Sequence, residues 1–219
     1  WATIGKDIAH IERATMEDVQ DFFFRFYRPN NAVMVIAGAV KLAQVEKLAK
    51  KWFGGIPAGA PYVRNIAQEP VQTEARFLET SAAVPLNSLV KVYHMPGRYE
   101  HGYYAADLVS DIIGRGKSSR LYKSLLKENP IFNSIGASVT SSLDPGLFLI
   151  NGNLNPGVTL EEADAAVESI LEEMVKHGAF EQEVEKVKNQ SEATLAFSEV
   201  ELLNRAMNLA FAANGGDVN

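Results

Sequence analysis

The sequence predicts an α+β fold, an antiparallel sheet with helices packed on one of its faces. Beyond residue 73, pairs of strand-like segments alternate with segments whose apolar residues recur at helical spacing. One strand pair flanks Asp144-Pro145-Gly146, in which proline presets φ and glycine accepts a positive φ, so these strands should form an antiparallel hairpin. Hairpins alternating with helices are typical of the α+β class.

The N-terminal part of the chain predicts two helices with one strand between them. A cap at Thr15 opens the first helix, and Pro29 ends it. Its apolar face consists of Val19, Phe22, Phe23, Phe26 and Tyr27. Residues 32–39 are a short, continuous apolar run with β-branched residues, which predicts a buried strand, and a helix is expected over residues 42–52.

Residues 54–72 have no steady hydrophobic period and are interrupted by glycine and proline, which indicates an interdomain linker. We therefore expect three parts. Residues 1–55 are the C-terminal part of a first domain, and residues 56–72 are the linker. Residues 73–219 are a second domain that is truncated at its C-terminus.

The second domain should run strands, helices, strands, helices. Strands are expected at residues 75–80 and 88–95, joined by a turn at 85–87, and then at 133–141 and 147–153. The expected helices cover residues 103–113, 119–127, 181–196 and 200–213. A further helix begins at the capping box Thr159-Leu160-Glu161-Glu162 and ends near Gly178.

Composition narrows the range of functions. With 21 Lys+Arg against 27 Asp+Glu and a net charge of -6, the chain has no dense basic run and is not expected to bind nucleic acid. There is no cysteine, and no apolar stretch approaches the length of a membrane span. The chain opens with neither an initiator Met nor a signal-like segment, so both ends are expected to be cut. The compartment stays open, the periplasm or cell envelope included if an upstream signal peptide has been removed.

No self-contained active site is expected. The four histidines, His10, His94, His101 and His177, lack the spacing that places two imidazoles and a carboxylate together on a helix. Residues 116–120 do not form a nucleophile elbow, and residues 114–119 lack the glycine spacing of a phosphate loop. We therefore assign no catalytic residue and no metal ligand in this chain.

An ordered set of short motifs nevertheless resembles the pitrilysin/insulinase-type (M16-like) zinc metallopeptidases, which include processing peptidases. The set consists of YRPNNAVMVIAG at 27–38, WFGGIP at 52–57, EPVQ at 69–72, YHMP at 93–96, IGRGKSSRL at 113–121 and DPGLF at 144–148. The motifs occur in the order and rough spacing of the family. No single motif is specific to the family, because each consists mostly of residues that are common in turns or in hydrophobic cores.

The resemblance implies that the zinc site of the parent protein lies on an H-x-x-E-H helix in the first domain, before residue 1, so this fragment carries no zinc. It also implies a role in substrate handling for the glycine-containing loop at 114–118, which gives Gly114, Gly116, Lys117 and Ser118 as substrate-binding candidates; a purely structural loop is the alternative. Members hold the substrate with an Arg/Tyr pair, and the matching positions here are Leu126 and Asn133. Neither can supply a guanidinium or a phenol.

The leading hypothesis is a fragment of a zinc endopeptidase that degrades or processes peptides and works as a heterodimer with a homologous subunit that carries the missing pair. The fragment alone should be inactive. One alternative is a catalytically inactive member that acts as a structural or assembly subunit. The other is an unrelated α+β binding module.

Overall fold

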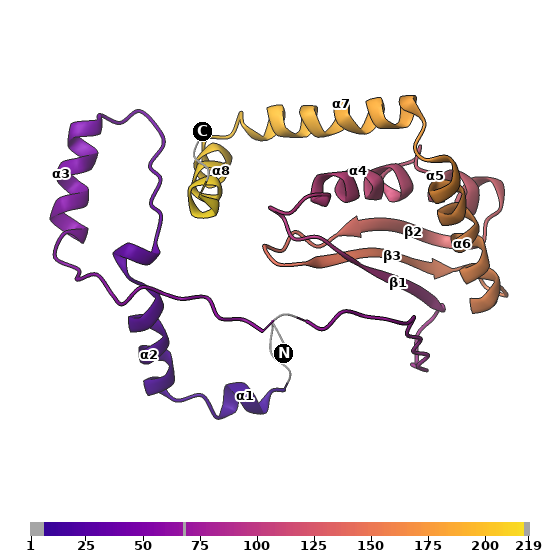
Figure 1. Ribbon diagram of the computed structural model, residues 1–219, viewed down its shortest axis with the longest axis horizontal. Coiled ribbons are helices and arrows are strands. Elements are labelled where there is room, and N and C mark those ends of the chain that lie inside the picture. Colours follow the sequence, from indigo (N-terminus) through magenta and orange to yellow (C-terminus); the bar gives the residue numbers. More distant parts are fainter. Residues whose placement is uncertain (1–6, 68, 217–219) are drawn as a thin grey trace. The chain divides into compact units, whose positions relative to one another are not determined.

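A computed structural model describes residues 7–67 and 69–216 (Figure 1). Residue 68 of the expected linker and the ends of the two expected domains lie outside the described residues. The chain divides into two compact units, one of Trp1–Ala75 with Ala196–Asn219 and one of Arg76–Leu195. Among the described residues, no helix is long and apolar enough to cross a membrane.

The N-terminal unit is helical. It contains α1 (Ala9–Glu12), α2 (Met16–Phe26), the 3₁₀ helix η1 (Pro29–Asn31), α3 (Leu42–Phe53) and α8 (Leu202–Gly215). The start of α2 is fixed by the predicted cap: the Thr15 hydroxyl accepts from the Asp18 N–H, and the Asp18 carboxylate accepts from the Thr15 N–H. The expected helices at the start of the chain are thus present.

Two predicted strands are absent from the described residues. Residues 32–39 have no regular secondary structure, and Val33, Met34 and Ile36 are 46–53% exposed instead of buried. Residues 75–80 are also outside any strand. A strand needs a neighbouring strand to satisfy its backbone, and the described part of the N-terminal unit offers none to residues 32–39. The predicted hairpin of residues 75–95 is therefore wrong.

The second unit has an antiparallel three-stranded sheet in the order β1–β3–β2. The strands are β1 (Ser88–Met95), β2 (Phe132–Val139) and β3 (Gly146–Leu154). β2 and β3 form the hairpin predicted around Asp144-Pro145-Gly146. β1 pairs with the other edge of β3, with Val92 opposite Leu149.

Five helical segments belong to or begin in this unit. They are α4 (Tyr103–Gly114), α5 (Arg120–Tyr122), the π-helix η2 (Lys123–Glu128), α6 (Leu160–His177) and α7 (Glu181–Ser198). The single helix expected over 119–127 is a short α-turn that continues as a π-helix. In η2 the Asn129 N–H donates to the carbonyl of Ser124, five residues back.

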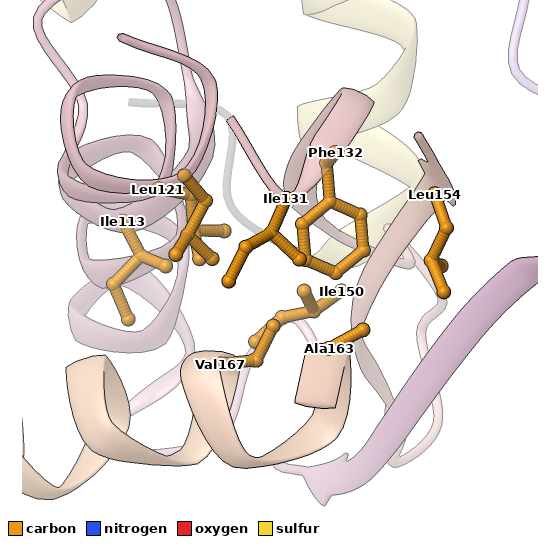
Figure 2. Close-up of a cluster of buried hydrophobic side chains, with 9 residues drawn as sticks. Ile113, Leu121, Ile131, Phe132, Ile150, Leu154, Ala163 and Val167 are labelled. Atoms are coloured by element: carbon orange, nitrogen blue, oxygen red, sulfur yellow. The ribbon is translucent and has the colours of Figure 1, made fainter. Parts of the chain in front are cut away.

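The core lies between one face of the sheet and helices α4, α5 and α6 (Figure 2). Ile150 and Leu154 of β3 point to this face, because side chains alternate along a strand. They meet Ile113 of α4 and Val167 of α6, all at most 2% exposed. Each such side chain stabilises the fold by about 1.5–3 kcal/mol through burial. This arrangement confirms the predicted α+β class with helices on one face.

Candidate functional site

The loop between α4 and α5 carries the four residues predicted to contact substrate. It begins at Gly114, where α4 crosses closest to the sheet. A Cβ at this position would lie 1.9 Å from the backbone nitrogen of Ala137 in β2. Only glycine allows this approach, so Gly114, which is half-buried, sets the position of the loop over the sheet.

The next glycine shapes the turn. Gly116 has φ +78°, a left-handed conformation that side chains disfavour. Its carbonyl accepts from both the backbone N–H (3.2 Å) and the hydroxyl (2.8 Å) of Ser119. Ser119 is fully buried, so its hydroxyl is a structural group that holds the turn closed.

The exposed tip of the loop presents donors. Arg115 forms an ion pair with Asp111 one turn earlier in α4 at 2.9 Å. Lys117 is exposed, and the Ser118 hydroxyl accepts from the Nζ of Lys186 in α7 at 3.0 Å. In the part of the chain that the structure describes, neither Lys117 nor Lys186 forms an ion pair. The tip therefore offers two ammonium groups to a ligand.

Arg120, the first residue of α5, holds the C-terminal end of the loop. Its Nε and Nη2 donate to the two carboxylate oxygens of Glu183 in α7 at 2.9 and 2.6 Å, and Nη2 also donates to the Gly178 carbonyl. The guanidinium lies over the ring of Phe180, 5.2 Å from its centroid. The hydrogen bonds from Arg120 lower the pKa of Glu183, which keeps the pair ionised at neutral pH.

The resemblance matches two positions of this chain, Leu126 and Asn133, to an Arg/Tyr pair. Leu126 in η2 packs against the core cluster. Asn133 lies where the β2–β3 register shifts between Phe132 and Ser134, so it is the extra residue of a β-bulge, and it is exposed.

The described residues contain no group of three or more His, Asp or Glu side chains that could hold a metal ion. His10 is in α1, His94 in β1, His101 just before α4 and His177 at the end of α6. The fold does not bring these four imidazoles into one site.

The structure thus brings Ser118, next to the exposed Lys117, together with Lys186, which sequence reasoning missed. Lys186 is separated from Ser118 by 68 residues, and no local pattern links them. Arg120 and Glu183 were missed for the same reason. The arrangement can donate hydrogen bonds to peptide carbonyls or carboxylates, and its buried groups are used to hold the loop.

A family model described as the peptidase M16 inactive domain matches residues 13–191. The zinc protease PqqE of Helicobacter pylori is 25% identical over 199 residues, which cover 88% of this chain and 44% of that protein. The chain therefore spans less than half the length of this curated relative.

Solved structures show the same fold. The crystal structure of a protease from Helicobacter pylori superposes with a TM-score of 0.86 at 23% identity, over 97% of this chain and 52% of that one. A peptidase M16 inactive domain from Pseudomonas fluorescens superposes with a TM-score of 0.78 at 22% identity, over 96% of this chain and 49% of that one.

Proposed function

Because the chain belongs to the peptidase M16 family, matching the model of its inactive domain, we propose that it is the non-catalytic portion of a zinc-dependent endopeptidase that degrades or processes peptides. The observation that carries the proposal is the match of residues 13–191 to that inactive domain, together with a zinc protease as the curated relative. In this proposal residues 1–55 end one domain, of the zinc-bearing type, and residues 73–219 belong to the next.

The described residues do not fit a zinc ion. Zinc in proteins takes four ligands, typically His, Cys or carboxylate. This chain has no cysteine, and its histidines lie in four separate places. The zinc would be held by residues of the parent protein outside this chain, where it would activate water for peptide hydrolysis.

The role proposed for this chain is to position a peptide. Lys117, Ser118 and Lys186 form a donor-rich tip on a loop whose geometry is fixed by Gly114, Gly116 and the Arg120–Glu183 pair. Positioning by a rigid element is a large part of what makes attack on a peptide bond effective. A homologous partner subunit would supply the Arg and Tyr that Leu126 and Asn133 cannot.

The proposal is tested by comparing this chain, its full-length parent and the parent with its co-purifying homologue. Elemental analysis and a fluorogenic peptide assay should find no stoichiometric zinc and no cleavage for the chain alone. The parent should bind zinc and should need the homologue for full activity. Tight one-to-one zinc with chelator-sensitive cleavage by the chain alone would contradict the assignment. A zinc-free, inactive parent would instead support a structural or assembly subunit.

The loop is tested in the active assembly. Lys117→Met and Lys186→Met should each raise KM for the peptide several-fold while leaving kcat nearly unchanged. Each variant removes an interaction that is equally strong in the ground state and in the transition state. Lys188→Met, an exposed lysine of α7, serves as the matched control. Unchanged KM in both loop variants would show that the loop has only a structural role.

A further inference from the structure

A groove of about 460 Å³ lies within the N-terminal unit. One wall comes from the last turn of α2 and the residues after it, and contributes Phe24, Arg25 and Arg28. Residues 59–63, which have no regular secondary structure, form the other wall.

Hydrogen bonds and a ring contact hold the two walls together. The side-chain amide of Asn30 accepts from the Gly59 N–H at 2.8 Å and donates to the Gly59 carbonyl at 3.1 Å. A Cβ on Gly59 would lie 2.6 Å from Cγ of Arg28, so glycine lets the aliphatic stem of this arginine cross the segment. Phe26 and Tyr62 add an edge-to-face contact with ring centroids 5.3 Å apart.

The groove is positively charged in an acidic chain. Its lining contains both arginines and no acidic residue, while the whole chain has a net charge of -6. The Arg28 guanidinium lies 5.5 Å from the centroid of Phe24, and its Nε donates to the Phe24 carbonyl. Arg25 lies over Phe26 at 5.1 Å. Within the described residues neither guanidinium forms an ion pair.

We propose that this groove binds the carboxylate of an acidic side chain in an extended peptide. A guanidinium presents a planar fork of donors that matches a carboxylate, and aromatic stacking holds both arginines in place. Phe24, Tyr62 and Val63 are 46–79% exposed and provide apolar surface for the residues that flank the carboxylate. The volume is within the range of small-ligand sites, about 300–1,000 Å³.

This inference is independent of the proposed function. It concerns a different unit of the chain from the α4–α5 loop and requires no catalytic activity. Its failure would leave the peptidase assignment unchanged.

The test uses the full 219-residue chain and a capped tetrapeptide with one Glu flanked by apolar residues. Its Gln counterpart and inorganic phosphate are the comparison ligands. Calorimetry at low salt should show the Glu peptide binding about tenfold more tightly than the Gln peptide, because one charge-assisted bond of about 1.5 kcal/mol corresponds to that factor. Amide chemical shifts of residues 59–63 should move with the Glu peptide.

Arg25→Gln and Arg28→Gln should each remove most of this preference. Arg28→Lys keeps the charge and the stem, so it tests the site if Arg28→Gln unfolds. Arg13→Gln, an exposed arginine outside the groove, is the control. Equal affinity for the Glu and Gln peptides would overturn the proposal. Tighter binding of phosphate than of the Glu peptide would also overturn it and would point to an inorganic anion site.

Discussion

Single ion pairs connect parts of the second unit that are far apart in sequence. Arg120 and Glu183 form a two-pronged pair whose side chains are 13% and 20% exposed. Glu183 also accepts from the Phe180 N–H at 2.9 Å, so one carboxylate fixes both the start of α5 and the start of α7. A partly buried, charge-assisted pair with good geometry contributes more than a surface salt bridge does.

Glu183→Gln should lower the free energy of unfolding at pH 7 by about 1–3 kcal/mol, because Arg120 keeps its charge but loses its anionic partner. The hydrogen bonds from Arg120 lower the folded-state pKa of Glu183. The ionised carboxylate therefore contributes stability above its unfolded pKa of about 4.3, and this contribution is lost as the pH falls through the lower folded pKa.

Urea unfolding of wild type and Glu183→Gln at several pH values measures this difference. It should be largest near neutral pH and should narrow below about pH 4. Glu185→Gln, at an exposed neighbouring position of α7, should show little change. A constant difference between the two proteins down to pH 2 would rule out the ion pair as its cause.

At the scale of elements, the local signals that proved decisive are caps and turns. Thr15 and Thr159 cap α2 and α6, and the hydroxyl of each accepts from a backbone N–H. The reciprocal bond that completes a capping box is present at Thr15. Gly178 follows the last residue of α6 with φ +72°. Each of these signals is satisfied within a few residues, so no tertiary contact is needed to place it.

Two ion pairs link strand β1 to helix α6. Nζ of Lys91 contacts Asp164 and Glu168 at 2.5 Å each, and the lysine side chain is 14% exposed. Burial alone would lower the pKa of Lys91, but hydrogen bonds to the two carboxylates outweigh it and raise the pKa. Lys91 thus stays charged on the helix-covered face of the sheet.

Lys91→Met should lower the free energy of unfolding by about 1 kcal/mol, because the stem stays buried while both carboxylates, roughly half exposed, return to water. Amide hydrogen exchange should become faster in β1 than in β2. The effect should shrink at high salt, which screens the pair in the wild type. Loss of protection spread evenly over the sheet would contradict a local tie between β1 and α6.

In the molecule as a whole, the chain connects the two units twice, through a long segment without regular structure and within α7. Between the end of α3 and the start of β1, none of the described residues belongs to a helix or a strand. Phe77 and Leu78 in this segment are 84% and 87% exposed. Such a segment has little to protect its backbone from a protease.

Brief chymotrypsin treatment should therefore cut first at Phe77 or Leu78. Phe197 is nearly as exposed, at 77%, but lies in α7, where the backbone is hydrogen-bonded, so it is an internal control. Mass spectrometry of the first products identifies the site. First cuts inside α6, which lies wholly within the second unit, would mean that the boundary between the units is elsewhere.

The α+β class, the β2–β3 hairpin and nearly every helix could be predicted from the amino-acid sequence. These features depend on local periodicity, caps and turns, and Asp144-Pro145-Gly146 and Thr159 are sufficient to fix their elements. The glycine loop could also be located, because Gly114 and Gly116 stand out between two helical patterns.

Strand pairing and the surroundings of the α4–α5 loop, in contrast, depend on long-range packing. Residues 32–39 have a strong strand pattern but form no strand, because backbone hydrogen bonds in a sheet come from a second segment that the pattern does not specify. Lys186 contacts Ser118, and Glu183 contacts Arg120, each across more than 60 residues. Contacts at such separation arise from packing, so local sequence signals cannot reveal them.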